Sequence, residues 1–162
     1  MTMINEAEFI GLNDKPALLA ISAPEWLDAA KGVLAEIGYK VHAASNHDDF
    51  IVRFGRIQYQ LVLIEELFAA NSPDENYTLR YLQRMPMAQR RHAVFILLGN
   101  SFSTLNTLQA FQHSVHAVVN RDEMALLGAS ILGPIVQRVV ADNDLFLHVL
   151  RDTQRQLLQG RA

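Results

Sequence analysis

The chain has 162 residues, half of them hydrophobic, and a formal net charge of −3. This mixture and length are typical of a globular chain with one buried core and exclude a disordered or fibrous chain. The absence of cysteine excludes disulfides, thiolate zinc sites and cysteine nucleophiles. No apolar run approaches the roughly 20 residues of a bilayer span, and residues 1–6 lack a signal-peptide pattern, so we expect a cytoplasmic protein without a membrane segment.

Charge is distributed unevenly along the chain. Residues 1–75 contain 12 acidic and 5 basic residues, a balance of −7, whereas residues 76–162 contain 5 acidic and 9 basic residues, a balance of +4. No carboxylate occurs between Glu75 and Asp122, a stretch that includes five arginines. The asymmetry indicates either a face that meets an anionic partner or a solvated basic helix.

Five short apolar runs have the character of β-strands. The first, third and fourth are continuous enough to indicate strands that are buried on both faces, and the second is weaker. The runs occupy residues 17–21, 40–44, 60–64, 93–98 and 117–119.

Amphipathic segments between these runs predict helices. Ser22 and Glu25 have the spacing of a capping box, and Pro24 suits the first turn of a first helix. Gly38 lies where the C-cap of this first helix would be, and Asn46 can cap a second helix, whose apolar stripe is Phe50, Ile51, Phe54 and Ile57. Pro86 stops a later helix. Ser103 or Thr104 can cap the next one, which carries Leu105, Leu108 and Phe111. Residues 122–159 have a helical pattern, with a kink or restart expected at Gly133-Pro134.

The alternation of strands and helices predicts the fold class. It favours a parallel sheet covered on both faces, and five units fit the flavodoxin-like doubly wound α/β fold of strand order 2-1-3-4-5. In this fold, ligands bind at the carboxyl ends of the strands. We expect an N-terminal lead over residues 1–15, one domain over residues 16–141, and an extended C-terminal helix over residues 142–162.

Several segments resemble the receiver domain of two-component response regulators. Residues 38–46, GYKVHAASN, resemble the stretch from the end of that family's first helix through its second strand, and residues 60–65, QLVLIE, resemble its third strand. Pro24 falls where the family often has a proline that opens its first helix. The resemblance covers about residues 16–141 and implies a receiver-like domain there.

The resemblance also implies where phosphoryl-transfer chemistry would lie. A receiver has two acidic Mg²⁺ ligands after the first strand, a phosphoacceptor Asp after the third, a Ser or Thr after the fourth and a Lys after the fifth. Here these positions fall on Ile21 and Ser22, on Glu65, on Leu98 or Gly99, and on Asn120. No shift by one residue restores the set, so the resemblance implies a degenerate receiver.

Glu65 has two interpretations. Because Glu is one methylene longer than Asp, Glu65 either mimics the phosphorylated state by carrying charge further out, or is a carboxylate that faces solvent or a nearby arginine. A mimic requires a cationic clamp, which Arg121 supplies only if its side chain turns inward. An active but eccentric receiver would require Glu65 or Glu66 to take the phosphoryl group.

The last helix is expected to be longer than that of a receiver. Its apolar residues keep a spacing close to a heptad, and burial of each large side chain is worth roughly 1.5–3 kcal/mol. The helix either pairs with a second copy, contacts a further domain, or packs on the core of its own chain. The candidate dimer residues are Val139, Phe146, Val149, Leu150 and Leu157.

We therefore interpret the chain as a non-catalytic pseudo-receiver, a phosphorylation-independent module that binds a protein partner, forms a homodimer through its last helix and requires no cofactor. The alternative is a sensory domain that binds an anionic, nucleotide-like small molecule at the strand ends through Arg80, Arg84 or Arg121. His113 and His116 lack nearby carboxylates, so no metal site is expected. A pI of about 6.0 argues against a nucleic-acid partner.

Overall fold

The computed structural model describes residues 9–123 and 131–160, without the side chains of residues 144–148, 150 and 151. Its five strands form one parallel sheet in the order β2-β1-β3-β4-β5, which confirms the flavodoxin-like topology. The strands are β1 Lys15–Ala20, β2 Tyr39–Ala43, β3 Leu61–Glu65, β4 Val94–Gly99 and β5 Ala117–Asn120.

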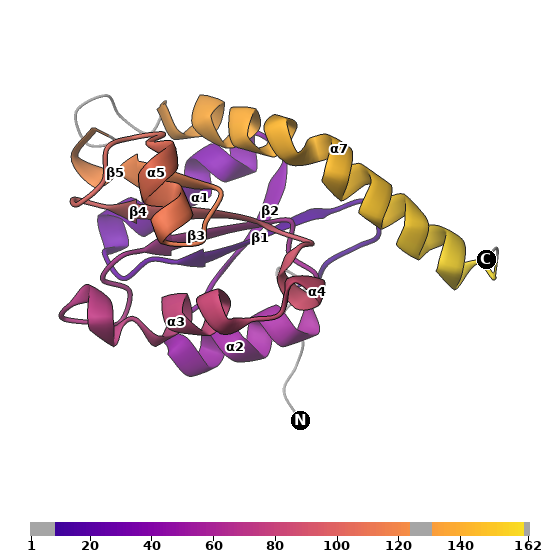
Figure 1. Cartoon of the computed structure of the whole chain (residues 1–162), viewed down its shortest axis with the longest axis horizontal. Helices are drawn as coiled ribbons and strands as arrows, with labels where there is room; N and C mark the ends of the chain where they lie inside the picture. Colours follow the sequence, from indigo (N-terminus) through magenta and orange to yellow (C-terminus); the bar gives the residue numbers. More distant parts are fainter. Residues whose placement is uncertain (1–8, 124–130, 161–162) are drawn as a thin grey trace.

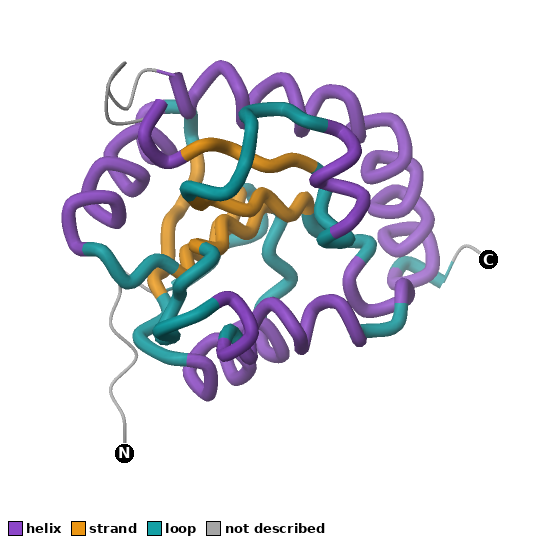
Figure 2. Tube along the Cα trace, turned by 60° about the vertical axis from the view of Figure 1, so that its left-hand side comes forward, coloured by secondary structure: helices purple, strands orange, loops and turns teal. Residues whose placement is uncertain are grey.

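Helices cover both faces of this sheet (Figures 1 and 2). In chain order they are α1 Pro24–Glu36, α2 His47–Arg56, the 3-10 helix η2 Pro73–Glu75, α3 Tyr77–Arg84, α4 Met87–Arg90, α5 Thr107–Gln112 and α7 Leu132–Leu158. Figure 1 shows α1 and α7 on one side of the strands and α2 and α3 on the other.

The core has two halves because successive strand residues point to opposite faces of the sheet. Leu19 of β1 belongs to the cluster that α1 and α7 complete, for example through Leu34 and Val136. The neighbouring Leu18 belongs to the other cluster, which includes Phe50 of α2. Burial on both faces is the reason that the strands appear in the sequence as continuous apolar runs.

The start of α1 differs from the expected capping box. Its N-cap is Ala23, with no side-chain cap, and Pro24 lies at the first helical position. Ser22 instead accepts a hydrogen bond through Oγ from the backbone N–H of Ala69, at 2.7 Å. Two other expected signals are confirmed: Gly38 follows α1 with φ +96°, and Asn46 caps α2 by accepting from the N–H of Asp49 at 2.8 Å.

Helix α5 begins later than expected, and the residues that it buries therefore differ from the expected ones. Asn106 is the cap, with Oδ1 accepting from the N–H of Gln109 at 3.0 Å, whereas Thr104 accepts the N–H of Asn120. The expected caps Ser103 and Thr104 are therefore wrong. Ala110 is the buried residue of this short helix, and Leu108 and Phe111, expected in its apolar stripe, are exposed.

Helix α7 runs without interruption across residue 142, where a domain boundary was expected. It begins at Leu132, so Gly133-Pro134 lies in its first turn. Of the two expectations for this dipeptide, the helix restart therefore holds and the kink does not. The part of the expected helix at residues 124–130 lies outside the described residues. The second half of α7 extends past the strands in Figure 1.

Candidate functional site

The carboxyl ends of the strands bring the expected receiver positions to one edge of the sheet. In the strand register, Glu65 of β3 lies opposite Leu98 of β4, and Gly99 lies opposite Asn120 of β5. The loop after β1 brings Ser22 to the same edge, in contact with Glu65. This follows from the parallel alignment, since parallel strands end at a common edge.

The Glu65 carboxylate is buried and bonded through both of its oxygens. Only 5% of the residue is exposed. Its Oε2 accepts hydrogen bonds from the backbone N–H of Ser22 at 2.9 Å and of Ala23 at 3.3 Å. These groups lie just before α1, whose Pro24 has no N–H. The negative charge therefore lies at the positive end of the α1 dipole and takes the place of the cap predicted from Ser22.

Arg121 provides the opposite charge, because its side chain turns inward. Its Nη1 donates to Oε1 of Glu65 at 3.2 Å. The guanidinium also lies over the ring of Trp26 in α1, 5.1 Å from the ring centroid. Sequence reasoning misses Trp26, since an aromatic residue in an amphipathic helix is usually a packing residue.

Glu66 places a second buried carboxylate beside the first. The residue is 8% exposed, and its Oε2 accepts a hydrogen bond from Ser101 Oγ at 3.1 Å. A Cβ added at Gly99 would lie 2.9 Å from Cβ of Glu66, closer than such atoms approach one another. Glycine at position 99 thus makes room for the Glu66 side chain.

Asn76 joins the end of β3 to α3. It is fully buried, and its Nδ2 donates to the carbonyl oxygens of Glu65 and Glu66, both at 3.0 Å. Its Oδ1 accepts from the N–H of Leu79 at 3.1 Å and so caps α3. The sequence signal that would have identified it is an Asn immediately before the helical Leu79 and Leu82 pattern.

No polar side-chain group of Ile21, Leu98 or Asn120 bonds to Glu65. Ile21 and Leu98 are each 3% exposed and belong to the core on the α1 and α7 face. Asn120 donates to the carbonyl of Phe102 at 2.8 Å and accepts from the N–H of Asp122 at 2.8 Å. Asn120 therefore ties the loop after β4 to the end of β5.

A pocket of about 270 Å³ opens beside the two carboxylates. Arg121 is the cationic residue among the described residues that line it, and its charge is paired with Glu65. Arg80 and Arg84 are exposed on α3 and do not line this pocket. The three candidate anion-binding arginines are therefore not brought together, and two carboxylates at the pocket oppose an anionic ligand.

The solved structures that match this arrangement of strands and helices include receiver domains. The CheY-like receiver domain protein of Methanospirillum hungatei matches 82% of this chain and 98% of its own, with a TM-score of 0.61 and 16% identity. The receiver domain of a putative Luxo repressor protein of Vibrio parahaemolyticus matches 84% and 97%, with a TM-score of 0.63 and 14% identity. The chain has the fold of a receiver.

The receiver fold also occurs in larger proteins. NtrX of Brucella abortus, solved in complex with ATP, matches 85% of this chain with a TM-score of 0.63 and 14% identity. The chain spans 29% of the length of that protein. No protein-family model matches the sequence, and no curated protein matches it significantly.

In this receiver fold, the candidate dimer residues differ in exposure along α7. Val139 is 6% exposed and lies in the core of its own chain, so the expectation that it faces a partner is wrong. Val149 and Leu157 are 55% and 62% exposed. The side chains of Phe146 and Leu150 lie outside the described residues.

The described ranges hold neither a membrane-spanning helix nor a cluster of metal-binding side chains. None of the helices in residues 9–123 and 131–160 is long and apolar enough to cross a membrane. In the same ranges, no three His, Asp or Glu side chains are grouped so that they could hold a metal ion. His113 packs edge-on against Phe102, and Nδ1 of His116 accepts the N–H of Phe95.

Proposed function

We propose that the chain is a non-catalytic pseudo-receiver, a cytoplasmic signalling module that binds a protein partner without being phosphorylated. The observation that carries this proposal is the state of the Glu65 carboxylate. At the position that the resemblance assigns to the phosphoacceptor, both oxygens are already bonded, one to Arg121 and the other to the backbone before α1.

Phosphoryl transfer at this edge would lack several of its parts. Mg²⁺ takes oxygen ligands, but the Ile21 side chain has none and the Ser22 hydroxyl already accepts a hydrogen bond from Ala69. Leu98 has no hydroxyl for a phosphoryl oxygen. A carboxylate fixed by a cation and by two N–H groups is also a poor nucleophile, so attack on phosphorus is disfavoured.

The ion pair supports the interpretation of Glu65 as a mimic of the phosphorylated state. In a receiver, phosphorylation adds negative charge at the end of the third strand, where the Lys after the fifth strand can pair with it. Here Glu65 and Arg121 supply both charges permanently, 56 residues apart in the chain. The pair holds the end of β3, the start of α1 and the end of β5 in one arrangement.

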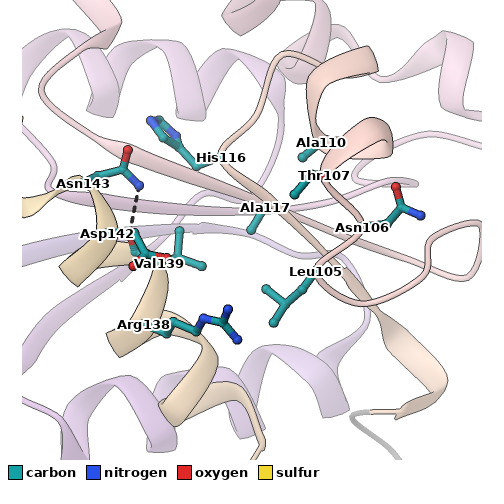
Figure 3. Close-up of a pocket in the computed structure, with 10 residues that line it drawn as sticks. All are labelled: Leu105, Asn106, Thr107, Ala110, His116, Ala117, Arg138, Val139, Asp142 and Asn143. Atoms are coloured by element: carbon teal, nitrogen blue, oxygen red, sulfur yellow. Dashed lines mark hydrogen bonds between the residues drawn. The ribbon is translucent and has the colours of Figure 1, made fainter.

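The surface formed by α5, β5 and α7 is the proposed site for the partner. The resemblance implies binding through the last two helices and the fifth strand. A pocket of about 190 Å³ lies between these helices, where Leu105 and Thr107 face Arg138 and Val139 (Figure 3). Leu108 gives α5 an exposed apolar side chain.

The test is a two-dimensional amide NMR spectrum recorded before and after addition of Mg²⁺ and beryllofluoride, which mimics an aspartyl phosphate. We expect no saturable shifts, because the Glu65 carboxylate is occupied. Widespread saturating shifts centred on Ser22, Glu65 and Leu98 would contradict the proposal and return the protein to the phosphorylated switches.

Two controls make the NMR result interpretable. An active receiver domain in the same buffer establishes that beryllofluoride is present in its reactive form. The Glu65→Asp variant tests whether the acceptor residue alone prevents the reaction. We expect this variant also to remain unchanged, because Ile21 and Leu98 still supply no metal ligand or hydroxyl.

A further inference from the structure

A groove of about 820 Å³ lies at the opposite end of the sheet from Glu65. Most of the residues lining it precede β4 and β5 or lie at the end of α5, and so surround the amino ends of these strands, and Asn143 of α7 completes the lining. They include Met85, Met87, Arg90, Arg91, Phe111 and Val115. The groove is therefore a separate surface from the carboxyl-end pocket, and it adjoins the proposed partner pocket between α5 and α7, with which it shares His116 and Asn143. An occupant for this groove goes beyond the proposed function.

Large apolar side chains are exposed at this groove. Phe111 at the end of α5 is 82% exposed, and Met87 at the start of α4 is 65% exposed. Exposed apolar residues that gather along a groove are characteristic of an interaction surface, whereas scattered ones are not. Methionine and phenylalanine are also enriched where proteins bind one another.

The described residues that line the groove include two arginines and no Asp or Glu. Arg90 is only 8% exposed, and its guanidinium donates to the carbonyl oxygens of Leu82 and Ser114 and lies over the Phe95 ring. No carboxylate pairs with it among the described residues, and burial lowers the pKa of Arg90, though arginine remains charged. Arg91 adds an exposed cation.

His116 does not add to this charge. Its Nδ1 accepts the N–H of Phe95 at 2.9 Å, which requires the neutral ring. Partial burial of the imidazole, and then the nearby Arg90 guanidinium, lower the pKa of His116. The cations of the groove are therefore its two arginines, within a stretch of sequence that has no Asp or Glu from residue 76 to residue 121.

We propose that this groove binds an acidic amphipathic peptide segment of a partner protein, whose carboxylates meet the exposed Arg91 while its apolar side chains cover Met87 and Phe111. Charge complementarity identifies the occupant, since the buried Arg90, which no described carboxylate neutralises, adds its positive charge beneath Arg91 and favours an anionic partner. A second copy fits less well, because a two-fold contact would place the arginines of one groove against those of the other.

The experiment measures binding of a fluorescent helical peptide, with Leu and Phe on one face and Glu on the flanks, to the full chain by fluorescence anisotropy. A peptide with Gln in place of each Glu is the matched probe. We expect Arg91→Gln to weaken binding about five-fold and Phe111→Ser about ten-fold, with weaker binding at higher salt. Arg56→Gln, an exposed arginine on α2 that does not line the groove, is the control.

Three outcomes would overturn the proposal. The first is equal binding of the Glu and Gln peptides. The second is no binding of the Glu peptide at roughly 1 mM, the weak end of measurable affinity. The third is a dimer of the unaltered chain, measured by light scattering without peptide, that dissociates in the Phe111→Ser variant. That result would make a second copy of the chain the occupant of the groove. Amide NMR shifts at Arg91 and Phe111 on addition of the Glu peptide would support it.

Discussion

At the scale of single residues, Glu65 has two structural roles at once. Its carboxylate caps the start of α1 and neutralises Arg121. Glu65→Ala would leave two N–H groups without an acceptor and the guanidinium without its counter-charge. We expect the free energy of unfolding in urea to fall by about 2–4 kcal/mol.

Glu36 provides the matched control for this substitution. It is exposed on α1, so Glu36→Ala is expected to change the free energy of unfolding by less than about 0.5 kcal/mol. Equal losses in the two variants would show that the bonds of Glu65 contribute nothing beyond a surface charge.

His116 predicts a dependence of stability on pH. Its pKa in the folded chain lies below the ordinary value of 6.5, because of partial burial and then the charge of Arg90. Below about pH 6.5 the unfolded chain therefore takes up a proton that the folded chain resists, so stability is fully present above this pH and is lost as the pH falls. The loss of stability levels off once the imidazole of the folded chain is also protonated.

The variant His116→Asn isolates this effect. Asparagine retains an acceptor for the Phe95 N–H but does not titrate. Urea unfolding at about pH 7.5 and about pH 5.5 should show a smaller loss of stability on acidification in the variant than in the original chain. The same loss in both would assign the pH dependence to other groups.

The residue contacts of the site were only partly predictable from the sequence. The position of Glu65 after a buried strand follows from local pattern, and so does the position of Arg121 after β5. Their ion pair spans 56 residues, and its formation depends on the inward turn of a side chain, which no local pattern determines. Asn76 was missed because its two bonds to β3 depend on how the loop returns to the sheet.

At the scale of elements, strands were easier to predict than the ends of helices. The five apolar runs fall on the five strands to within about two residues, because burial on both faces leaves a continuous signal. The first turn of α5 was misplaced because Ser103, Thr104 and Asn106 are all good caps. Thr104 is engaged with Asn120 across the loop, which leaves Asn106 as the cap.

Helix α7 is expected to stabilise the fold through its first half. Leu132 is fully buried between the sheet and α1, so Leu132→Ala should lower the free energy of unfolding by roughly 2–5 kcal/mol. Leu158 near the other end is 90% exposed, and Leu158→Ala should cost less than about 0.5 kcal/mol. Urea unfolding of the two variants measures the difference, and comparable losses would mean that the far end of α7 is also buried.

At the scale of the whole molecule, the exposed end of α7 bears on the oligomeric state. Val149 and Leu157 are more than half exposed on a helix that extends past the sheet. We expect a homodimer by light scattering, and we expect Val149→Asp with Leu157→Asp to give a monomer that remains folded, because a charge buried in the contact would be unpaired.

The control for this prediction carries the same change on another helix. Val52 of α2 is 48% exposed, so Val52→Asp introduces a similar charge far from α7 and should leave the dimer intact. A monomer at all concentrations for the unaltered chain would show that the end of α7 does not pair with a second copy.

The bonds of Glu65 also determine the effect of a shorter acid at this position. Aspartate at position 65 would shorten the side chain by one methylene, which draws its oxygens away from the two N–H groups before α1 and from Arg121. If the proposed function is right, Glu65→Asp lowers stability and gives no phosphoryl transfer, because Ile21 and Leu98 offer neither a metal ligand nor a hydroxyl. Natural selection would then retain glutamate at this position.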